Sequence, residues 1–191
     1  MIYFTSDYHA GHKNILTLCN RPFANIEEME NAIIKNNNAV VTDDDTIYDL
    51  GDVAYRCSPQ HVSEFLRRLN GKRIILFGNH DKSLRQAKKR GLLNDLINSG
   101  KIKFIGSDDP NEITGYRTTA YGQRLILSHG AYRSWYGAFR GAYHLYGHSH
   151  GNLKPYYKSF DVGVDANNFS PLSFTQIQEK MDVIESAFSE S

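Results

Sequence analysis

The stretch GHSHG at residues 147–151 decides how this chain of 191 residues is read. It sets His148 and His150 two positions apart, directly after a strand-like run of residues. Residues two apart in extended backbone project to the same side, so both imidazoles can face one ion. A single motif of this length has little specificity, and its meaning depends on what accompanies it elsewhere in the chain.

Four other polar signatures precede this stretch, and each also follows a strand-like segment. They are DYH at residues 7–9, GD at 51–52, GNHD at 78–81 and SHG at 128–130. Ligand sites of open α/β sheets lie at the carboxyl ends of the strands, so the five signatures are expected to converge. Together they are typical of a hydrolytic site with two metal ions, which ionise a shared water at neutral pH.

The residue types in these signatures indicate which metals to expect. Imidazole nitrogen and carboxylate oxygen suit Zn, Mn and Fe, whereas the lack of thiolates argues against a closed structural zinc site. Asp52 is the natural bridging ligand because its carboxylate has two oxygens, and Asn79 offers a neutral amide oxygen. The two cysteines, Cys19 and Cys57, lie far apart without C-x-x-C spacing, so both are expected to be free thiols.

Hydrophobic periodicity and turn residues predict alternating strands and helices in the first half of the chain and mostly strands in the second. Helices are expected over residues 27–41, 59–70, 82–98 and 175–188, the second of them with Ser58 as N-cap and Pro59 in its first turn. Strands are expected at residues 2–6, 46–50, 73–77, 102–105, 112–120, 124–128, 143–146 and 156–160. This order favours one sheet-rich layered α/β domain over residues 1–191.

The composition is ordinary for a soluble globular domain, with 40% hydrophobic residues, 23% charged residues and a net charge of +1. A disordered or fibrous protein is thereby disfavoured. Residues 1–6 are too short for the apolar part of a secretion signal, and no apolar run is long enough to cross a bilayer. The cytoplasm is therefore the expected location, with no membrane partner.

The five signatures, in this order and over residues 7–150, resemble those of the calcineurin-like metallophosphoesterase superfamily. Residues 21–23 (RPF) and the tail at residues 162–173 are similar to small single-domain members from bacteria and their phages. The resemblance implies a four-layer αββα sandwich of two sheets flanked by helices. It implies two divalent ions (Mn, Fe or Zn), one held by Asp7, His9, Asp52 and His150, and the other by Asp52, Asn79, His129 and His148.

The same resemblance implies a phosphoesterase in which a hydroxide bridging the metals attacks phosphorus. His80 matches the position that lies over the metals in the family, where it stabilises the transferring phosphoryl group and protonates the departing oxygen. Asp81 is expected to orient or charge-stabilise His80, and N-cap of the following helix is its alternative role. The expected substrate is a phosphodiester or nucleotide-type ester, with a phosphomonoester as the alternative.

Four side chains are expected to border the substrate. Arg21 is the best candidate for a phosphate contact, because a guanidinium binds oxyanions through two parallel hydrogen bonds; a surface ion pair is its alternative. The other three are His12, Arg56 and Arg133. Residues 131–146 are rich in aromatic side chains and arginines, which suits base stacking, although core packing is the better explanation for most of the rings.

Two other functions of the same fold remain open at this point. A nuclease is suggested by residues 67–90, which carry nine basic side chains and one acidic one, but the chain is too short for an obvious additional nucleic-acid-binding domain. A small phosphate ester or nucleotide therefore ranks first as partner. A non-catalytic scaffold would tolerate loss of His80 or of the ligands, and all of them are present.

Overall fold

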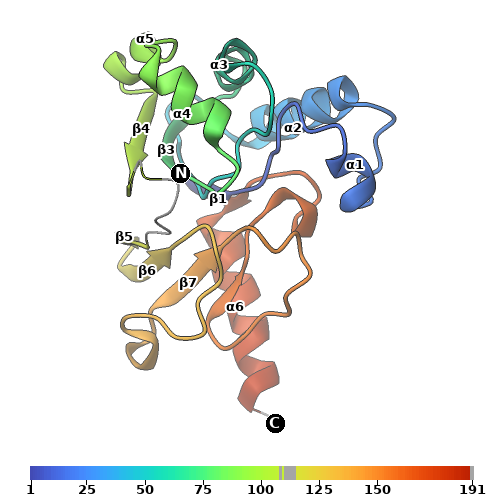
Figure 1. Ribbon diagram of the computed structural model, residues 1–191. Helices are drawn as coiled ribbons and strands as arrows, with labels where there is room; N and C mark the ends of the chain where they lie inside the picture. Colours follow the sequence, from blue (N-terminus) through green and yellow to red (C-terminus); the bar gives the residue numbers. More distant parts are fainter. Residues whose placement is uncertain (108, 110–114, 190–191) are drawn as a thin grey trace.

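The computed structural model describes residues 1–107, 109 and 115–189, which form two β-sheets packed face to face (Figure 1). In the first sheet, with order β4-β3-β2-β1-β9, strands β1 to β4 are parallel and β9 is antiparallel to β1. In the second, with order β5-β6-β7-β8, an antiparallel hairpin of β5 and β6 precedes parallel pairing of β6, β7 and β8. The strands are β1 (Ile2–Thr5), β2 (Thr46–Asp49), β3 (Lys72–Leu76), β4 (Ile102–Ile105), β5 (Tyr116–Ala120), β6 (Gln123–Leu127), β7 (Tyr143–Tyr146), β8 (Ser159–Asp161) and β9 (Leu172–Ser173).

Helices flank the two sheets, as the sequence predicts. Helices α2 to α5 cover the first sheet and share a core with β3 and β4, whereas α6 lies beside the second sheet and contacts β1 and β9 (Figure 1). This arrangement confirms the layered α/β fold. Within the described part of the chain, no helix is long and apolar enough to cross a membrane. The helices are α1 (Ile15–Leu18), α2 (Ile26–Val40), α3 (Pro59–Arg67), α4 (Lys82–Lys89), α5 (Asn94–Asn98) and α6 (Phe174–Ser189), with 3-10 helices η1 (Ala138–Arg140) and η2 (Val164–Ala166).

The core between the sheets follows from the alternation of side chains along the strands. On β6, Leu125 and Leu127 face the first sheet, while Ile126 between them faces the opposite way. Phe4 of β1 belongs to the same core, and its ring stacks on Tyr48 of β2 with ring centroids 5.4 Å apart. Each large apolar side chain buried here contributes roughly 1.5–3 kcal/mol by leaving water. This packing holds the carboxyl ends of the parallel strands of both sheets at one edge of the molecule.

Most predicted elements are confirmed with shifts at their ends. Helix α3 begins after Ser58, whose hydroxyl accepts a hydrogen bond from the His61 N–H, as its sequence predicts. The strand expected at residues 156–160 starts only at Ser159, because Tyr157 has left-handed backbone with φ 51°. Of the strand expected at 112–120, residues 112–114 lie outside the described part of the chain. Elements α1, η1, η2 and β9 are too short to leave a periodic pattern, and the sequence does not predict them.

The helix expected over residues 82–98 is wrong, because the structure has two helices there. Gly91 adopts φ +73° and ends α4, a conformation that glycine reaches without steric cost. Its N–H donates to the Lys88 carbonyl, and the Leu92 N–H donates to the Ala87 carbonyl. These two bonds form a Schellman cap, so the apolar periodicity that continues past Gly91 belongs to the separate helix α5.

The outer face of the second sheet is covered by residues 130–142, the outer connection, which joins β6 to β7 and contains η1. Trp135 and Ala138 of this connection pack in one cluster with Ile126 of β6. The Trp135 indole N–H donates to the Ala142 carbonyl 2.8 Å away, which closes the connection on itself. The layer on this side of the sandwich is therefore largely irregular backbone.

His144 of β7 is fully buried beneath the outer connection. Its Nδ1 lies 3.1 Å from the Ile126 carbonyl oxygen, and its Nε2 lies 2.9 Å from the Tyr132 backbone nitrogen. A neutral imidazole with its proton on Nδ1 satisfies both partners, because it donates to the carbonyl and accepts from the amide. Burial lowers the pKa of His144 to about 4.

We expect His144 to make the protein less stable as pH falls from about 6.5 to about 4, by up to about 3 kcal/mol. The unfolded chain takes up this proton near pH 6.5 and the folded chain only near pH 4, so acid favours the unfolded state. Urea unfolding across this range measures the effect. The non-titrating variant His144→Gln is expected to depend less steeply on pH, and equal slopes in variant and wild type would contradict the assignment.

Candidate metal centre

The seven predicted ligands lie together where strands of both sheets end. Asp52 is central among them: its Oδ2 is 3.5 Å from His9 Nε2 and 3.3 Å from His129 Nε2. His9 comes from the first sheet and His129 from the second, so the two sheets meet at this carboxylate. The ligands are Asp7 and His9 after β1, Asp52 after β2, Asn79 after β3, His129 after β6, and His148 and His150 after β7.

The ligand atoms fall into two groups, and in each group three atoms lie within 4.8 Å of one another. Asn79 Oδ1 adjoins the second group, 2.9 Å from His129 Nε2. This division is the same as that between the two ligand sets implied by the sequence resemblance, with Asp52 near both. The first group is Asp7, His9 and His150, and the second is Asp52, His129 and His148.

Three of these ligand atoms are buried without a hydrogen-bond partner within the described part of the chain: Asp7 Oδ1, His9 Nε2 and Asp52 Oδ2. A buried polar atom that makes no hydrogen bond costs about 1–3 kcal/mol, and more if it is charged. A cation among them would accept all three lone pairs. The residues therefore fit divalent metal ions of the kind bound by nitrogen and oxygen.

The pKa shifts of the buried groups also indicate that the centre suits a cation. Burial raises the pKa of Asp7 to about 7. Burial acts to lower the pKa of His129, but its close contact with Asp52 and the charges of Asp7 and Asp52 outweigh burial and raise that pKa to about 9. Burial lowers the pKa of His9 to about 3, so this imidazole is neutral and its Nε2 can act as a ligand. The buried carboxylates thus attract positive charge from proton or metal.

The backbone of the centre is strained. Non-glycine residues rarely adopt left-handed backbone, and such residues cost of order 1–3 kcal/mol each where they persist. Hydrogen bonds hold these turns: the His9 N–H donates to the Asp52 carbonyl at 2.9 Å, and the His148 N–H donates to Asp7 Oδ2 at 2.8 Å. Five of the seven candidate ligands have φ between 48° and 66°, namely Asp7, His9, Asp52, His148 and His150.

Two glycines permit the close approach of these turns. A Cβ on Gly147 would lie 2.1 Å from Ser6 Oγ and 2.5 Å from Asp7 Oδ2. A Cβ on Gly78 would lie 2.1 Å from Asp52 Oδ1. All three distances are far inside van der Waals contact. The glycines in the GHSHG and GNHD signatures are therefore required by packing against the carboxylates.

Acceptors outside the ligand set orient two of the histidines. His150 Nδ1 lies 2.7 Å from Asp165 Oδ2, and His129 Nδ1 lies 2.9 Å from the Leu50 carbonyl oxygen. A proton held on Nδ1 by these acceptors leaves Nε2 as the free lone pair, which is how ligand histidines are commonly fixed.

Arg21 is a positioning residue rather than a phosphate contact, which corrects the sequence prediction. Its side chain is buried and donates to both carboxylate oxygens of Asp165, at 2.8 and 2.7 Å. It also donates to the carbonyls of Tyr8 and Asp7, at 2.9 and 2.7 Å. The guanidinium therefore ties the DYH turn to Asp165 and has no face left for substrate.

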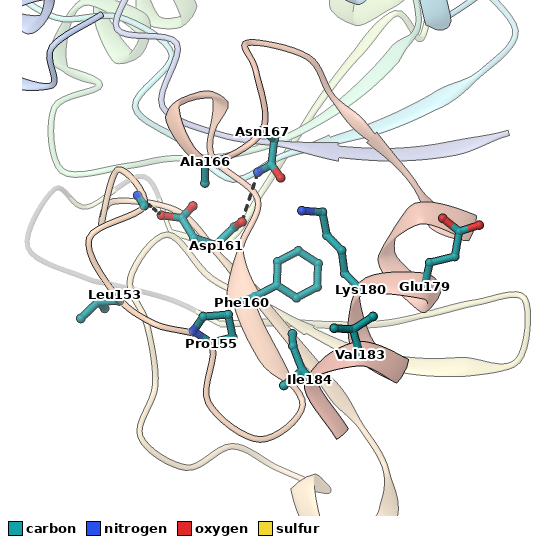
Figure 2. A pocket seen from close by; sticks show the side chains of 11 residues that line it. Leu153, Pro155, Phe160, Asp161, Ala166, Asn167, Glu179, Lys180, Val183 and Ile184 are labelled. Atoms are coloured by element: carbon teal, nitrogen blue, oxygen red, sulfur yellow. Dashed lines mark hydrogen bonds between the residues drawn. The ribbon is translucent and has the colours of Figure 1, made fainter. Parts of the chain in front are cut away.

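Asp161 fixes the turn that carries His148 and His150. Its Oδ2 accepts from Ser149 Oγ and from the Gly151 N–H. Its backbone carbonyl accepts from the Asn167 amide (Figure 2). Figure 2 also shows the hollow of about 450 Å³ that lies between this turn and α6, lined mainly by apolar side chains such as Phe160.

That Asp81 orients or charge-stabilises His80 stays a prediction. Asp81 occupies the N-cap position of α4, as its other sequence interpretation expects, but its side chain makes no capping hydrogen bond there. Its buried carboxylate accepts from the N–H groups of Asp52, Gly78 and Ala54, at 2.8, 2.8 and 3.3 Å. Asp81 thus joins the turns after β2 and β3. Its role is to position Asp52.

His80 lies on the rim of the centre and is partly exposed. Its N–H donates to Asp52 Oδ1 at 2.8 Å, and its ring centroid is 5.7 Å from that of His9. His12 is beside His9, with Nδ1 atoms 3.4 Å apart, and Tyr55 packs against the rings of both His80 and His12. These partly exposed rings form one wall of the centre.

The two remaining arginines lie in different places. Arg56 is exposed next to this wall, with its guanidinium 5.1 Å from the centroid of Tyr55. Arg133 is on the outer connection, 4.2 Å from the centroid of Tyr156, and so belongs to the outer face of the second sheet. Of the four predicted substrate contacts, His12 and Arg56 are therefore the two that remain beside the metal centre.

Residues 1–168 match the sequence profile of the family described as calcineurin-like phosphoesterase. The chain belongs to this family. A calcineurin-like phosphoesterase typically binds divalent metals, and the two groups of Asp and His ligands are candidate sites for them. The family resemblance read from the five signatures is thereby confirmed.

The chain is also similar to two other proteins and to one solved structure. An uncharacterized protein of Methanocaldococcus jannaschii is 34% identical over 184 residues, covering 92% of this chain and 88% of the relative. The gene 66 protein of Mycobacterium phage L5 is 32% identical over 81 residues, covering 41% and 39%. The crystal structure of a protein of unknown function from Aquifex aeolicus superposes with a TM-score of 0.69 at 22% identity, covering 94% of this chain and 98% of that one. That likeness supports the fold.

Asp161 and Asp165 are the residues that sequence reasoning missed. Asp161 is the last residue of strand β8 and Asp165 follows that strand, in the run DVGVD at residues 161–165, so they lie at a strand end like the five signatures. That position could have identified them as a sixth signature. Asp165 also forms a third possible metal group with Cys19 and His150, whose ligand atoms lie within 4.8 Å of one another.

We expect Asp165→Asn to weaken Mn²⁺ binding about 10- to 100-fold, because His150 loses the charged acceptor that holds its Nδ1–H. Isothermal titration with MnCl₂ measures the affinity, and circular dichroism checks that the variant is folded. Asp95→Asn is the matched control, since it breaks an exposed ion pair with Arg67 of similar chemistry. Equal Mn²⁺ affinity in the two variants would rule out the positioning role.

Proposed function

We propose that this protein is a metal-dependent phosphoester hydrolase that acts on phosphodiesters or nucleotide-type esters, with Mn, Fe or Zn as its ions. One observation carries the proposal: ligand atoms of Asp7, His9 and Asp52 converge, buried and without partners within the described residues. Such an arrangement is costly for the folded protein unless a cation fills it. The phosphoesterase family of the chain supports the type of reaction.

Two bound divalent cations would supply an ionised water at neutral pH and would neutralise charge on the phosphate oxygens. The chain's own contribution is to present the ligands in fixed geometry. Asp52 is held from both sides, by Asp81 at its backbone N–H and by the His80 N–H at its Oδ1. The reacting groups are thus positioned before substrate arrives, which lowers the entropic cost of reaction.

His80 is the proposed proton donor to the departing oxygen. Its backbone is tied to Asp52, so the ring stays beside the metal centre, while its partial exposure lets it reach a bound ester. Tyr55 packs edge-on against the ring, with centroids 4.8 Å apart, and limits its rotation. Arg56 and His12, on either side of Tyr55, are the proposed contacts for the non-reacting phosphate oxygens.

We expect His80→Ala to lower turnover roughly 10²- to 10⁴-fold for an ester with a poor leaving group and much less for a p-nitrophenyl ester. A dinucleotide phosphodiester and bis(p-nitrophenyl) phosphate, both with Mn²⁺, provide this comparison. Metal analysis is expected to show about two ions per chain in wild type and in His80→Ala, and loss of metal in Asp52→Ala and His148→Ala.

The same assays distinguish the alternatives. Faster hydrolysis of mono- than of bis-(p-nitrophenyl) phosphate would make the protein a phosphomonoesterase. A protein without metal and without activity on either ester would be a scaffold. Equal losses on good and poor leaving groups in His80→Ala would contradict the proton-donor role of His80.

A further inference from the structure

The outer face of the second sheet is strongly one-sided in charge. Residues 115–158, which build β5 to β7 and their connections, contain no Asp or Glu, although the whole chain has nearly equal numbers of acidic and basic residues. Lys158 forms an ion pair with Glu185. The four arginines of this segment are all exposed. They are Arg117, Arg124, Arg133 and Arg140.

The same face exposes aromatic rings that the sequence assigned to core packing. Phe139 of the outer connection is 97% exposed and Tyr136 is 68% exposed, whereas Trp135, next to Tyr136 in the chain, is buried. Tyr156 and Tyr157, in the turn before β8, are 41% and 37% exposed. Exposed rings gathered on one face mark an interaction site, because single scattered rings are the usual case on a protein surface.

Rings and guanidinium groups are paired on this face. Arg133 lies 4.2 Å from the ring centroid of Tyr156, and Arg117 lies 5.1 Å from that of Tyr136. Each pair presents a flat apolar surface with a positive charge beside it. Such pairs suit a ligand that combines a planar ring with a negative charge.

Three hollows run along the face and share walls. The first, of about 350 Å³, is lined by Arg133, Phe139 and the two tyrosines of the turn before β8. It shares Ser134 and Trp135 with the second, of about 430 Å³. The second shares Arg117 and Tyr136 with the third, of about 330 Å³. Neighbouring hollows have lining residues in common, so they lie side by side, and we call the three together the aromatic groove.

We propose that the aromatic groove binds single-stranded nucleic acid, with bases stacked on Phe139, Tyr136 and Tyr156 and phosphates bound by Arg117 and Arg133. Stacking on exposed rings requires bases whose faces are free, and a duplex hides those faces. A face without acidic side chains attracts a polyanion along its whole length. The groove is part of the sheet domain itself, so nucleic-acid binding needs no additional domain.

This inference is independent of the proposed hydrolysis, because binding is measured without turnover. The test uses fluorescence anisotropy of a 5′-fluorescein oligothymidylate of about 15 nucleotides, at low salt and with EDTA present. Phe139→Ala and Tyr136→Ala are each expected to raise Kd roughly tenfold, as stacked aromatic contacts do. Arg117→Ala and Arg133→Ala are each expected to reduce the slope of log Kd against log salt by about 0.7.

Two matched control substitutions distinguish binding in the groove from nonspecific electrostatic attraction. Tyr121 is 69% exposed, close to the value for Tyr136, but it lies at the β5–β6 turn beside Phe174. Arg90 is exposed at the end of α4, on the first sheet. Tyr121→Ala and Arg90→Ala are expected to leave Kd within about twofold of wild type. Because every substituted side chain is exposed, these variants leave no cavity in the core.

Four results would overturn the proposal. They are the absence of binding at low salt, equal affinity for a duplex of the same length, loss of binding in EDTA, and equal effects of the control and groove substitutions. Self-association of the wild type that Phe139→Ala abolishes, seen by size exclusion without any oligonucleotide binding, would instead make the groove a contact between protein chains.

Discussion

The structure depends on burying two carboxylates, those of Asp7 and Asp52, at the junction of two sheets. Neither carboxylate has enough partners within the described residues to offset its loss of water, since one oxygen of each makes no hydrogen bond there. Much of the surrounding architecture exists to hold these groups where a cation can reach them. Strained turns, close glycines and the buried Arg21 all stabilise that one arrangement.

Two sets of side chains with different roles organise the centre. Candidate ligands have lone pairs free for a cation, and a second, outer set of carboxylates, those of Asp81, Asp161 and Asp165, holds the surrounding turns and His150 in place. The outer carboxylates accept from backbone N–H groups, a hydroxyl, an imidazole and a guanidinium. Burial raises the pKa of Asp81 to about 8, and its three N–H donors act against that rise. Substituting one of these outer carboxylates would free the backbone turn that it holds and would not remove a ligand side chain.

The sequence predicted the family, the layered fold and the residues that gather at the candidate metal centre, because all three depend on short-range signals. Strand-like runs followed by polar residues identify strand ends, and parallel strands bring those ends together. The sequence did not reveal how the side chains of Arg21 and Asp81 are buried, for one shared reason. The sequence does not show whether a charged side chain faces substrate or a buried backbone, because that depends on tertiary packing. The same limit hid the exposure of Tyr136 and Phe139, since aromatic residues near buried strands ordinarily pack inward.

The irregular backbone of the outer connection allows this side of the fold to vary. A helix in that layer would be constrained at every turn by its packing on the sheet, whereas the outer connection is anchored at few points, among them the Trp135 indole bond and the amide over His144. Loops tolerate insertion and replacement better than the elements they join. The chain can therefore diversify what it recognises on one side of the sandwich while the ion-binding edge keeps its geometry.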